Sequence, residues 1–232
     1  IGTLISTLIV FCLTKTGFDL KNSYYDFIKN LKDYKRFPIF SLPAEFINNF
    51  SHNVPYIFIL TKFDPIFLGY YSLIIKALSA PIGLVGNSML TVFKEEASIE
   101  IREKGNCTKS YLRVFKFLSI LGIVGFSIYF LVAPDLFSIV FGENYLIAGE
   151  LSRIMIPLFL FRFIASPLSY TLFITNKQNI DLIWQVVLIM GVFLIFFLSK
   201  EFYYTIYIYV IFYSIMYLIS FLITKKLSSQ YI

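Results

Sequence analysis

Polar residues that could bind a ligand or move a proton are spaced along one face of an otherwise apolar segment. Glu45, Asn48, Asn49 and His52 fall within an arc of roughly 100° if this segment is an α-helix. Carboxylate and imidazole groups accept protons, and asparagine amides donate and accept hydrogen bonds. The pattern predicts a wet helix face, with Glu45 and His52 as candidate proton-coupling residues and Asn48 and Asn49 as candidate substrate ligands. For His52, a hydrogen-bonded packing role is the competing interpretation.

Two further apolar segments carry isolated cations. Lys76 shares a helix face with Asn87, and Arg162 is followed at i+4 and i+7 by Ser166 and Ser169. Ionisable groups are costly at membrane depth, so each one is a candidate for a substrate pathway or for a paired structural contact. Cations there would attract phosphate, because Arg can bind two oxygens at once and Lys acts as a point charge. Lys76 and Arg162 are therefore candidate phosphate ligands, and Asn87 lies on the polar face that Lys76 occupies.

The structural alternative is that Lys76 or Arg162 pairs with Glu45 and fixes helix contacts without touching a ligand. Three segments that each offer a polar face nevertheless describe a cavity better than a solid bundle. Arg153 follows Glu150 by three residues, so a local ion pair or snorkelling to the interface explains it better than a substrate contact.

The elements that must position these residues are transmembrane helices. The 232 residues are 58% hydrophobic and only 15% charged, whereas soluble domains are about 25% charged. About 20 apolar residues carry a helix across the hydrocarbon core. Six complete spans and the end of a seventh are predicted, at 1–14 (truncated), 38–60, 66–93, 112–133, 146–175, 182–198 and 202–223.

Basic residues gather in alternate loops, as this division into helices requires. Fifteen Lys and Arg residues fall in the first, third and fifth loops with their helix ends and in the tail, against two, Lys62 and Lys200, in the intervening loops. Because basic loops stay cytoplasmic, we expect a cytoplasmic C-terminus. The predicted domains are the end of a truncated helix (1–14), a basic cytoplasmic loop with a short interfacial helix (15–37), a six-helix bundle (38–224) and a cytoplasmic tail (225–232). For 15–37, an ordinary membrane-flanking loop is an equal alternative.

Several kinds of function are disfavoured. The net charge of +6 comes from short basic clusters and not from a continuous basic face, which argues against nucleic-acid binding. The chain has one histidine and no glycine-rich phosphate loop, metal-ligand cluster or serine nucleophile motif, so we expect neither an enzyme nor a cofactor or metal. Cys12 and Cys107 provide no disulfide framework. The predicted outer loops, 61–65, 134–145 and 199–201, are too short for a catalytic domain.

Two stretches of the sequence resemble Wzx-like polysaccharide flippases, within the superfamily of multidrug, oligosaccharidyl-lipid and polysaccharide exporters. The first, residues 34–98, contains F-P at 37–38, G-Y-Y-S at 69–72 and P-I-G-L-V-G-N-S at 81–88; the second is FRFIASPLSYTLFITNKQ at 161–178. Together they cover about a third of the chain, and helix order alone carries the resemblance through the remainder.

The resemblance implies a transporter of two six-helix halves around a central cavity, of which this chain would be the C-terminal half. Such proteins move undecaprenyl-pyrophosphate-linked oligosaccharides between leaflets for O-antigen or capsule synthesis. By similarity, Lys76 and Arg162 would contact pyrophosphate or sugar, and Asn87 would add hydrogen bonds. We therefore expect a flippase of the bacterial inner membrane that works by alternating access. Its expected partners are the lipid-linked oligosaccharide, membrane lipids and an N-terminal half of the same protein.

Three alternatives remain open. A cation-coupled multidrug-type exporter of the same superfamily would need acidic residues in the cavity, where Glu45 is the candidate. A membrane-embedded polysaccharide polymerase or glycosyltransferase would need a sizeable outer loop with catalytic residues. A non-transporting membrane scaffold would keep its function without Lys76 and Arg162.

Overall fold

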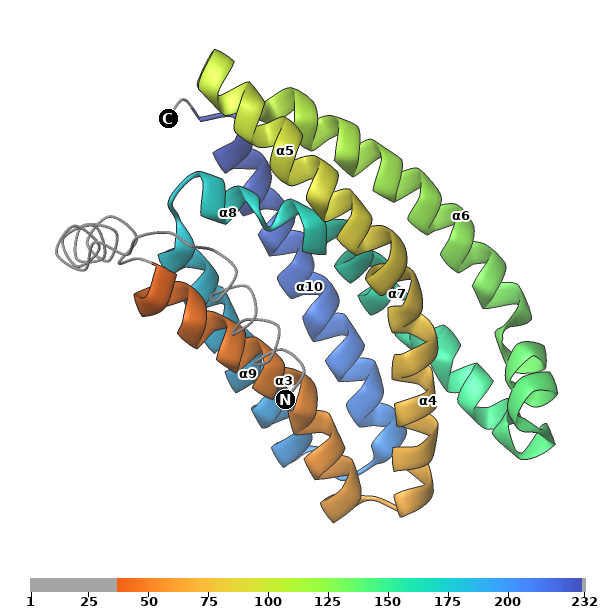
Figure 1. Ribbon diagram of the computed structural model, residues 1–232. Helices are drawn as coiled ribbons and strands as arrows, with labels where there is room; N and C mark the ends of the chain where they lie inside the picture. The colour runs from red at the N-terminus through yellow and green to blue at the C-terminus, as the bar shows by residue number, and fades with distance from the viewer. Residues whose placement is uncertain (1–36, 231–232) are drawn as a thin grey trace, which may run out of the picture.

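The computed structural model describes residues 37–230, and each regular element in this range is a helix (Figure 1). The elements in chain order are η1 (Phe37–Ser41), α3 (Leu42–Lys62), α4 (Pro65–Pro81), η2 (Ile82–Gly86), α5 (Asn87–Lys104), α6 (Thr108–Phe141), η3 (Glu143–Tyr145), α7 (Leu146–Leu168), α8 (Thr171–Ile174), α9 (Gln178–Leu198) and α10 (Phe202–Ser228). The truncated helix expected at 1–14 and the interfacial helix expected within 15–37 lie outside the described residues.

Five helical stretches of the described chain are long and apolar enough to cross a membrane. They are Pro65–Lys104, Thr108–Phe141, Glu143–Ile174, Gln178–Leu198 and Phe202–Ser228. The chain is therefore an all-α, multi-pass membrane protein, as its composition predicted. Helix α3 has 21 residues, but its polar face keeps it out of this group. The count of six complete spans stays a prediction.

Several helix boundaries differ from those predicted. Helices α4, η2 and α5 join into one helix of 40 residues that continues to Lys104, eleven residues past the predicted end at Phe93. The outer loop expected at 134–145 is wrong, because α6 continues through Pro134 to Phe141. Helix α9 begins at Gln178, four residues before the predicted start.

Helix α7 lies at the centre of the bundle. Helices α4, α6 and α10 pack against it. Helix α10 also packs against α9, and α3 packs against α9. Figure 1 shows α3 and α9 on one side of α10 and the α4–α5 helix on the other. Buried aromatic side chains such as Phe159 and Phe163 fill the centre of this arrangement. The helix faces that meet around α10 thus come from two sides of the molecule.

A lysine joins α3 and α9 at one end of this helix pair. Lys62 Nζ donates hydrogen bonds to the carbonyl oxygens of Phe196, Phe197 and Ser199, at 2.9, 2.6 and 3.1 Å. The last carbonyls of a helix have no partner within the helix, and a cation there also favours the negative end of the helix dipole. Lys62 therefore caps α9 and ties it to the end of α3.

An arginine supplies hydrogen-bond donors where a proline interrupts the backbone hydrogen bonds of α6. Pro134 has no N–H, so it cannot donate to the carbonyl of Phe130 four residues earlier. Arg153 of α7 donates to that carbonyl from Nε at 2.6 Å and to the Leu131 carbonyl from Nη2 at 3.0 Å. The expected ion pair with Glu150 is absent from the described residues, and carbonyl binding explains why α6 passes through Pro134 instead of ending there.

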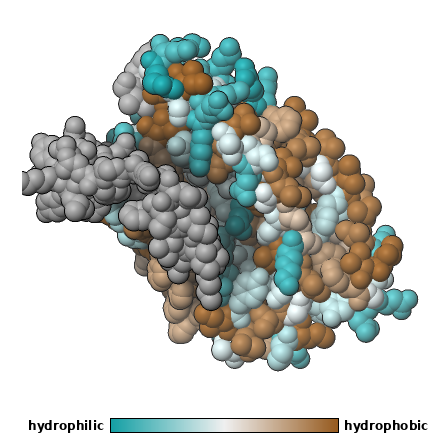
Figure 2. Space-filling model, in the orientation of Figure 1, coloured by the Kyte–Doolittle hydropathy of each residue, from teal (hydrophilic) through white to brown (hydrophobic). Residues whose placement is uncertain are grey.

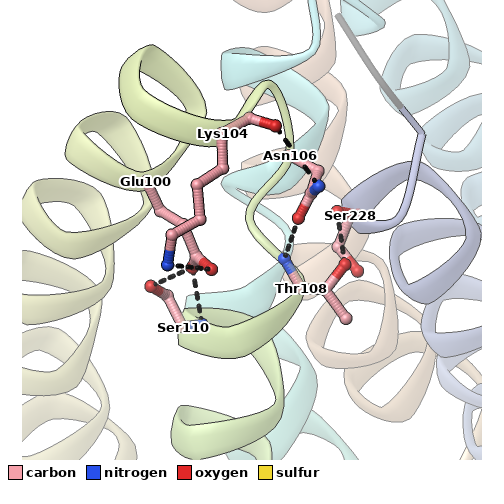
Figure 3. Close-up of polar contacts among 6 residues, drawn as sticks. All are labelled: Glu100, Lys104, Asn106, Thr108, Ser110 and Ser228. Carbon is pink, nitrogen blue, oxygen red and sulfur yellow. Dashed lines mark hydrogen bonds and ion pairs between the residues drawn. The ribbon is translucent and has the colours of Figure 1, made fainter.

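The turn between α5 and α6 is fastened to the end of α10 (Figure 3). The carboxylate of Glu100 accepts hydrogen bonds from the Ser110 amide at 2.8 Å and hydroxyl at 2.6 Å, so it caps the first turn of α6. The Cys107 amide and the Thr108 hydroxyl both donate to the carbonyl of Ser228, at 3.1 and 3.0 Å. These contacts join three helix ends at one end of the bundle.

Cys107 is sealed inside this junction. Its side chain is buried, and burial, with a smaller contribution from the negative charge of Glu100, raises the pKa of the thiol to about 11. The thiolate is the nucleophilic form. At neutral pH the thiol is therefore protonated and unreactive.

Replacing Arg153 should lower the free energy of unfolding less when Pro134 is also replaced. We expect Arg153→Ala to lower the free energy of unfolding by about 1–3 kcal/mol, because two carbonyls lose their donors. In a Pro134→Ala background the restored N–H can serve Phe130, so the same substitution should cost clearly less. Reversible unfolding in detergent, arranged as a double-mutant cycle, measures this. An equal loss of unfolding free energy in both backgrounds would contradict the role of Arg153 as the donor that replaces the missing N–H of Pro134.

Cys107 should react with iodoacetamide only as the pH approaches the pKa of about 11. A Cys12→Ser chain isolates this thiol for mass spectrometry. The control replaces Cys107 as well and carries Ser229→Cys, an exposed position on the same junction, whose thiol should react from about pH 8.5. If Cys107 were modified at pH 8 as fast as this control thiol, the buried junction would be wrong.

Candidate functional site

A cavity of ≈ 100 Å³ lies among α3, α7, α9 and α10 and the segment around α8. Its walls mix polar and aromatic side chains from these elements. The lining residues are Asn48, His52, Arg162, Ala165, Ser166, Ser169, Leu172, Ile180, Asp181, Trp184, Gln185, Tyr217, Ser220 and Ile223.

Three of the seven predicted site residues meet in this cavity. Asn48 and His52 of α3 face it together with Arg162 of α7. Glu45 and Asn49 are exposed and do not line it. The Asn49 amide instead donates to the backbone carbonyl of Glu45 at 2.9 Å and to its carboxylate at 3.4 Å. The polar face of α3 is therefore divided between the cavity and the neighbouring open surface.

Lys76 and Asn87 lie away from the cavity. Both are exposed, on α4 and at the start of α5, and neither lines it. Their predicted contact with substrate would require a ligand that extends beyond the cavity.

Among the described residues that line the cavity, Arg162 is the one with a permanent positive charge. It is half-buried, and Ser166 and Ser169 follow it along the same wall, as their spacing predicted. The two ion pairs within residues 37–230 both involve α5, one inside that helix and one with α6. Over that range neither Arg162 nor Lys76 is paired with Glu45. Among residues 37–230 the guanidinium therefore has no carboxylate partner.

Helix α9 supplies polar residues that the sequence analysis did not select. Asp181 and Gln185, four residues apart on α9, both line the cavity. Gln185 is only 7% exposed, and its Oε1 is buried without a hydrogen-bond partner. With Gln178 these residues have i, i+3, i+7 spacing, which marks one helix face. That signal was missed because the helix was expected to start at Leu182.

Aromatic side chains form the rest of the wall. The indole N–H of Trp184 donates to the backbone carbonyl of Met216 at 3.0 Å, which fixes the ring. The rings of Trp184 and Tyr217 lie 5.6 Å apart, between centroids. The cavity therefore offers a rigid aromatic surface beside its charged and amide groups.

Hydropathy divides the surface of the molecule (Figure 2). Hydrophilic residues gather where α5 ends and α6 begins, and others lie on the face between α3 and α4, while the flank along α6 is mainly hydrophobic. On that flank Ile139 is 83% exposed and Leu131 is 69% exposed. Large exposed apolar side chains suit contact with lipid, so the polar face and the lipid-facing flank are separate.

Comparison with known proteins identifies a family. The family model described as "Polysaccharide biosynthesis protein" matches residues 1–149, about two thirds of the chain. No curated protein and no solved structure gives a match.

A thiol placed in the cavity wall should be accessible to water. In a chain with Cys12 and Cys107 replaced by Ser, we expect Ser166→Cys to react with a water-soluble methanethiosulfonate, because Ser166 is an exposed lining residue. Ser152→Cys is the matched control, since Ser152 of the same helix is fully buried and donates to the Gly149 carbonyl at 2.6 Å. Mass spectrometry counts the modified protein. Equal protection of the two positions would mean that the cavity is dry.

Proposed function

This chain belongs to the polysaccharide biosynthesis protein family, and we propose that it moves an anionic, lipid-linked oligosaccharide across the membrane. The observation that carries the proposal is the position of Arg162 in a polar cavity, where no carboxylate of the described part of the chain pairs with it. A cation at membrane depth is costly unless a ligand or a neighbouring group compensates it. The phosphate groups of a lipid-linked sugar would supply that compensation through charge-assisted hydrogen bonds.

The helix connections support transport over polymerisation. Helices α3 and α4 are joined at Phe63 and Asp64, and α9 and α10 by residues 199–201. A polymerase or glycosyltransferase acting at this end of the bundle would need residues there to hold an acceptor and activate it. Connections of two and three residues leave space only for turning the chain. We therefore place the functional site of this chain in the cavity within the bundle and not in the helix connections.

The proposed cycle is alternating access in a bacterial inner membrane. The cavity would open to one leaflet and then to the other while a second helical bundle, expected from the resemblance to flippases, rocks against this one. The basic loops would lie on the cytoplasmic side with the C-terminus, as the positive-inside rule favours. Lys76 and Asn87, on the exposed face of α4 and α5, would meet the parts of a long substrate that the cavity does not hold.

An exporter of organic cations is the second candidate. Asp181 places a carboxylate in the cavity, and this is the acidic group that such an exporter would need. Arg162 lines the same small space, however, and its charge would oppose an entering cation. The family assignment also favours a saccharide substrate.

Replacing Arg162 should block export. In a strain lacking its own copy, the complete reading frame with Arg162→Ala should yield about ten- to a hundredfold less surface polysaccharide, because charge-assisted hydrogen bonds worth about 1.5–3 kcal/mol are lost. Lipid-linked oligosaccharide should accumulate on the inner leaflet, measured by extraction and by accessibility to an impermeant label.

The matched control for charge is Arg113→Ala. Arg113 is exposed and forms a surface ion pair with Glu96, which contributes about 1 kcal/mol or less, so export should stay near the unmodified level at equal expression. Normal surface polymer in both Lys76→Ala and Arg162→Ala chains would instead favour a non-transporting scaffold.

A further inference from the structure

We propose that Asp181 and Gln185 recognise hydroxyl groups of a sugar, so that the cavity holds a sugar together with its attached phosphate and not phosphate alone. This inference rests on the proposed function, and it specifies the part of the substrate that the cavity recognises. Asp181 and Gln185 would then determine specificity, while Arg162 would hold the negative charge.

The unpaired oxygen of Gln185 is the first observation. The side chain is 7% exposed, it lines the cavity, and its Oε1 is buried with no hydrogen-bond partner among the residues that the structure describes. Gln185 follows Asp181 by four residues on α9, so the two side chains lie on the same face of that helix. A buried acceptor without a donor costs free energy comparable to a lost hydrogen bond. A ligand that fills the cavity can complete this site by bringing a donor to Gln185.

The two sides of the cavity require opposite chemistry from a ligand. Arg162 can only donate hydrogen bonds, whereas the carboxylate of Asp181 and Oε1 of Gln185 can only accept them. The esterified, ionised phosphate groups of a lipid-linked sugar offer acceptors but no donors, so they suit Arg162 and leave the α9 side without hydrogen-bond donors. A sugar phosphate offers anionic oxygens at one end and hydroxyl donors a few bonds away, so it can satisfy both sides at once.

The aromatic wall suits a sugar ring. Trp184 is fixed by its hydrogen bond to Met216 and lies beside Tyr217. Ligand pockets combine apolar and aromatic walls with a few placed polar groups that set orientation. A sugar has the same division, because its C–H faces are apolar while its hydroxyl groups lie around the ring edge. One ring could therefore rest on Trp184 while its edge meets Gln185.

The volume limits how much of the substrate enters. One water-sized group occupies about 10–15 Å³ of cavity space. A cavity of ≈ 100 Å³ therefore holds about seven to ten such groups. A phosphate and the nearest part of one sugar fit that space, and a whole oligosaccharide does not. The sugar attached directly to the phosphate is therefore the one that the cavity recognises.

Binding to the purified full-length protein tests the proposal. Titration calorimetry would compare a hexose 1-phosphate, inorganic phosphate and the free hexose. We expect the hexose 1-phosphate to bind at least tenfold more tightly than inorganic phosphate. Gln185→Leu should remove most of that difference while leaving phosphate binding unchanged, and Arg162→Ala should weaken both anions.

Gln178→Leu is the matched control, because Gln178 has the same exposure, 7%, and an equally unpartnered Oε1 but does not line this cavity. It should leave all three affinities unchanged. Asp181→Asn, which keeps the shape of the side chain, should also reduce the preference for the sugar and covers the case in which Gln185→Leu fails to fold. Equal binding of phosphate and hexose 1-phosphate, or a sugar preference that survives both α9 substitutions, would overturn the proposal.

The outcome is separable from the test of transport. If Arg162→Ala blocks export while the α9 substitutions leave sugar preference intact, sugar recognition by Asp181 and Gln185 is wrong and transport stands. If sugar preference depends on Gln185 while Arg162→Ala exports normally, the site stands and the transport role of Arg162 is wrong.

Discussion

Backbone groups that lose their helical partners must find new ones within the protein, because the hydrocarbon core offers no hydrogen bonds. This requirement decides where the cations go. Lys62 supplies donors to the last carbonyls of α9. Arg153 supplies them where Pro134 interrupts α6. In each case a positive charge satisfies carbonyls of a neighbouring helix, so one contact both completes a helix and fixes its neighbour against it.

Arg162 differs from these two cations in what surrounds it. Among the described residues no hydrogen bond or ion pair of Arg162 fixes a neighbouring helix, and its surroundings are the polar groups of a cavity. A cation that already serves the backbone has little to offer a ligand, whereas one that faces an open polar space keeps its donors available. The division between structural and available cations therefore identifies the site more sharply than the presence of charge alone.

Sequence patterns predicted the all-α membrane fold, and they brought Asn48, His52 and Arg162 to attention. These are periodic signals within single helices, which a sequence displays directly. Helix ends were less accessible, because the continuation of α6 past Pro134 depends on Arg153 from another helix. Asp181 and Gln185 were missed for a related reason: their place in the cavity depends on where α9 begins and how it packs against α3. Contacts between distant segments are not written in the local pattern.

The cavity lies where two packed units meet. Helices α3 and α9 are joined by Lys62 at one end, and α6 and α7 are joined by Arg153. Asp181 and Gln185 belong to the first unit and Arg162 to the second, with α10 packed against both α7 and α9. A small displacement of one unit against the other would change the distance between the donor and acceptor sides of the cavity without breaking either backbone cap. A ligand that bridges the two sides would favour the arrangement in which they are close, because it binds that arrangement more tightly. Under the proposed function, substrate binding and helix movement would therefore depend on the same interface.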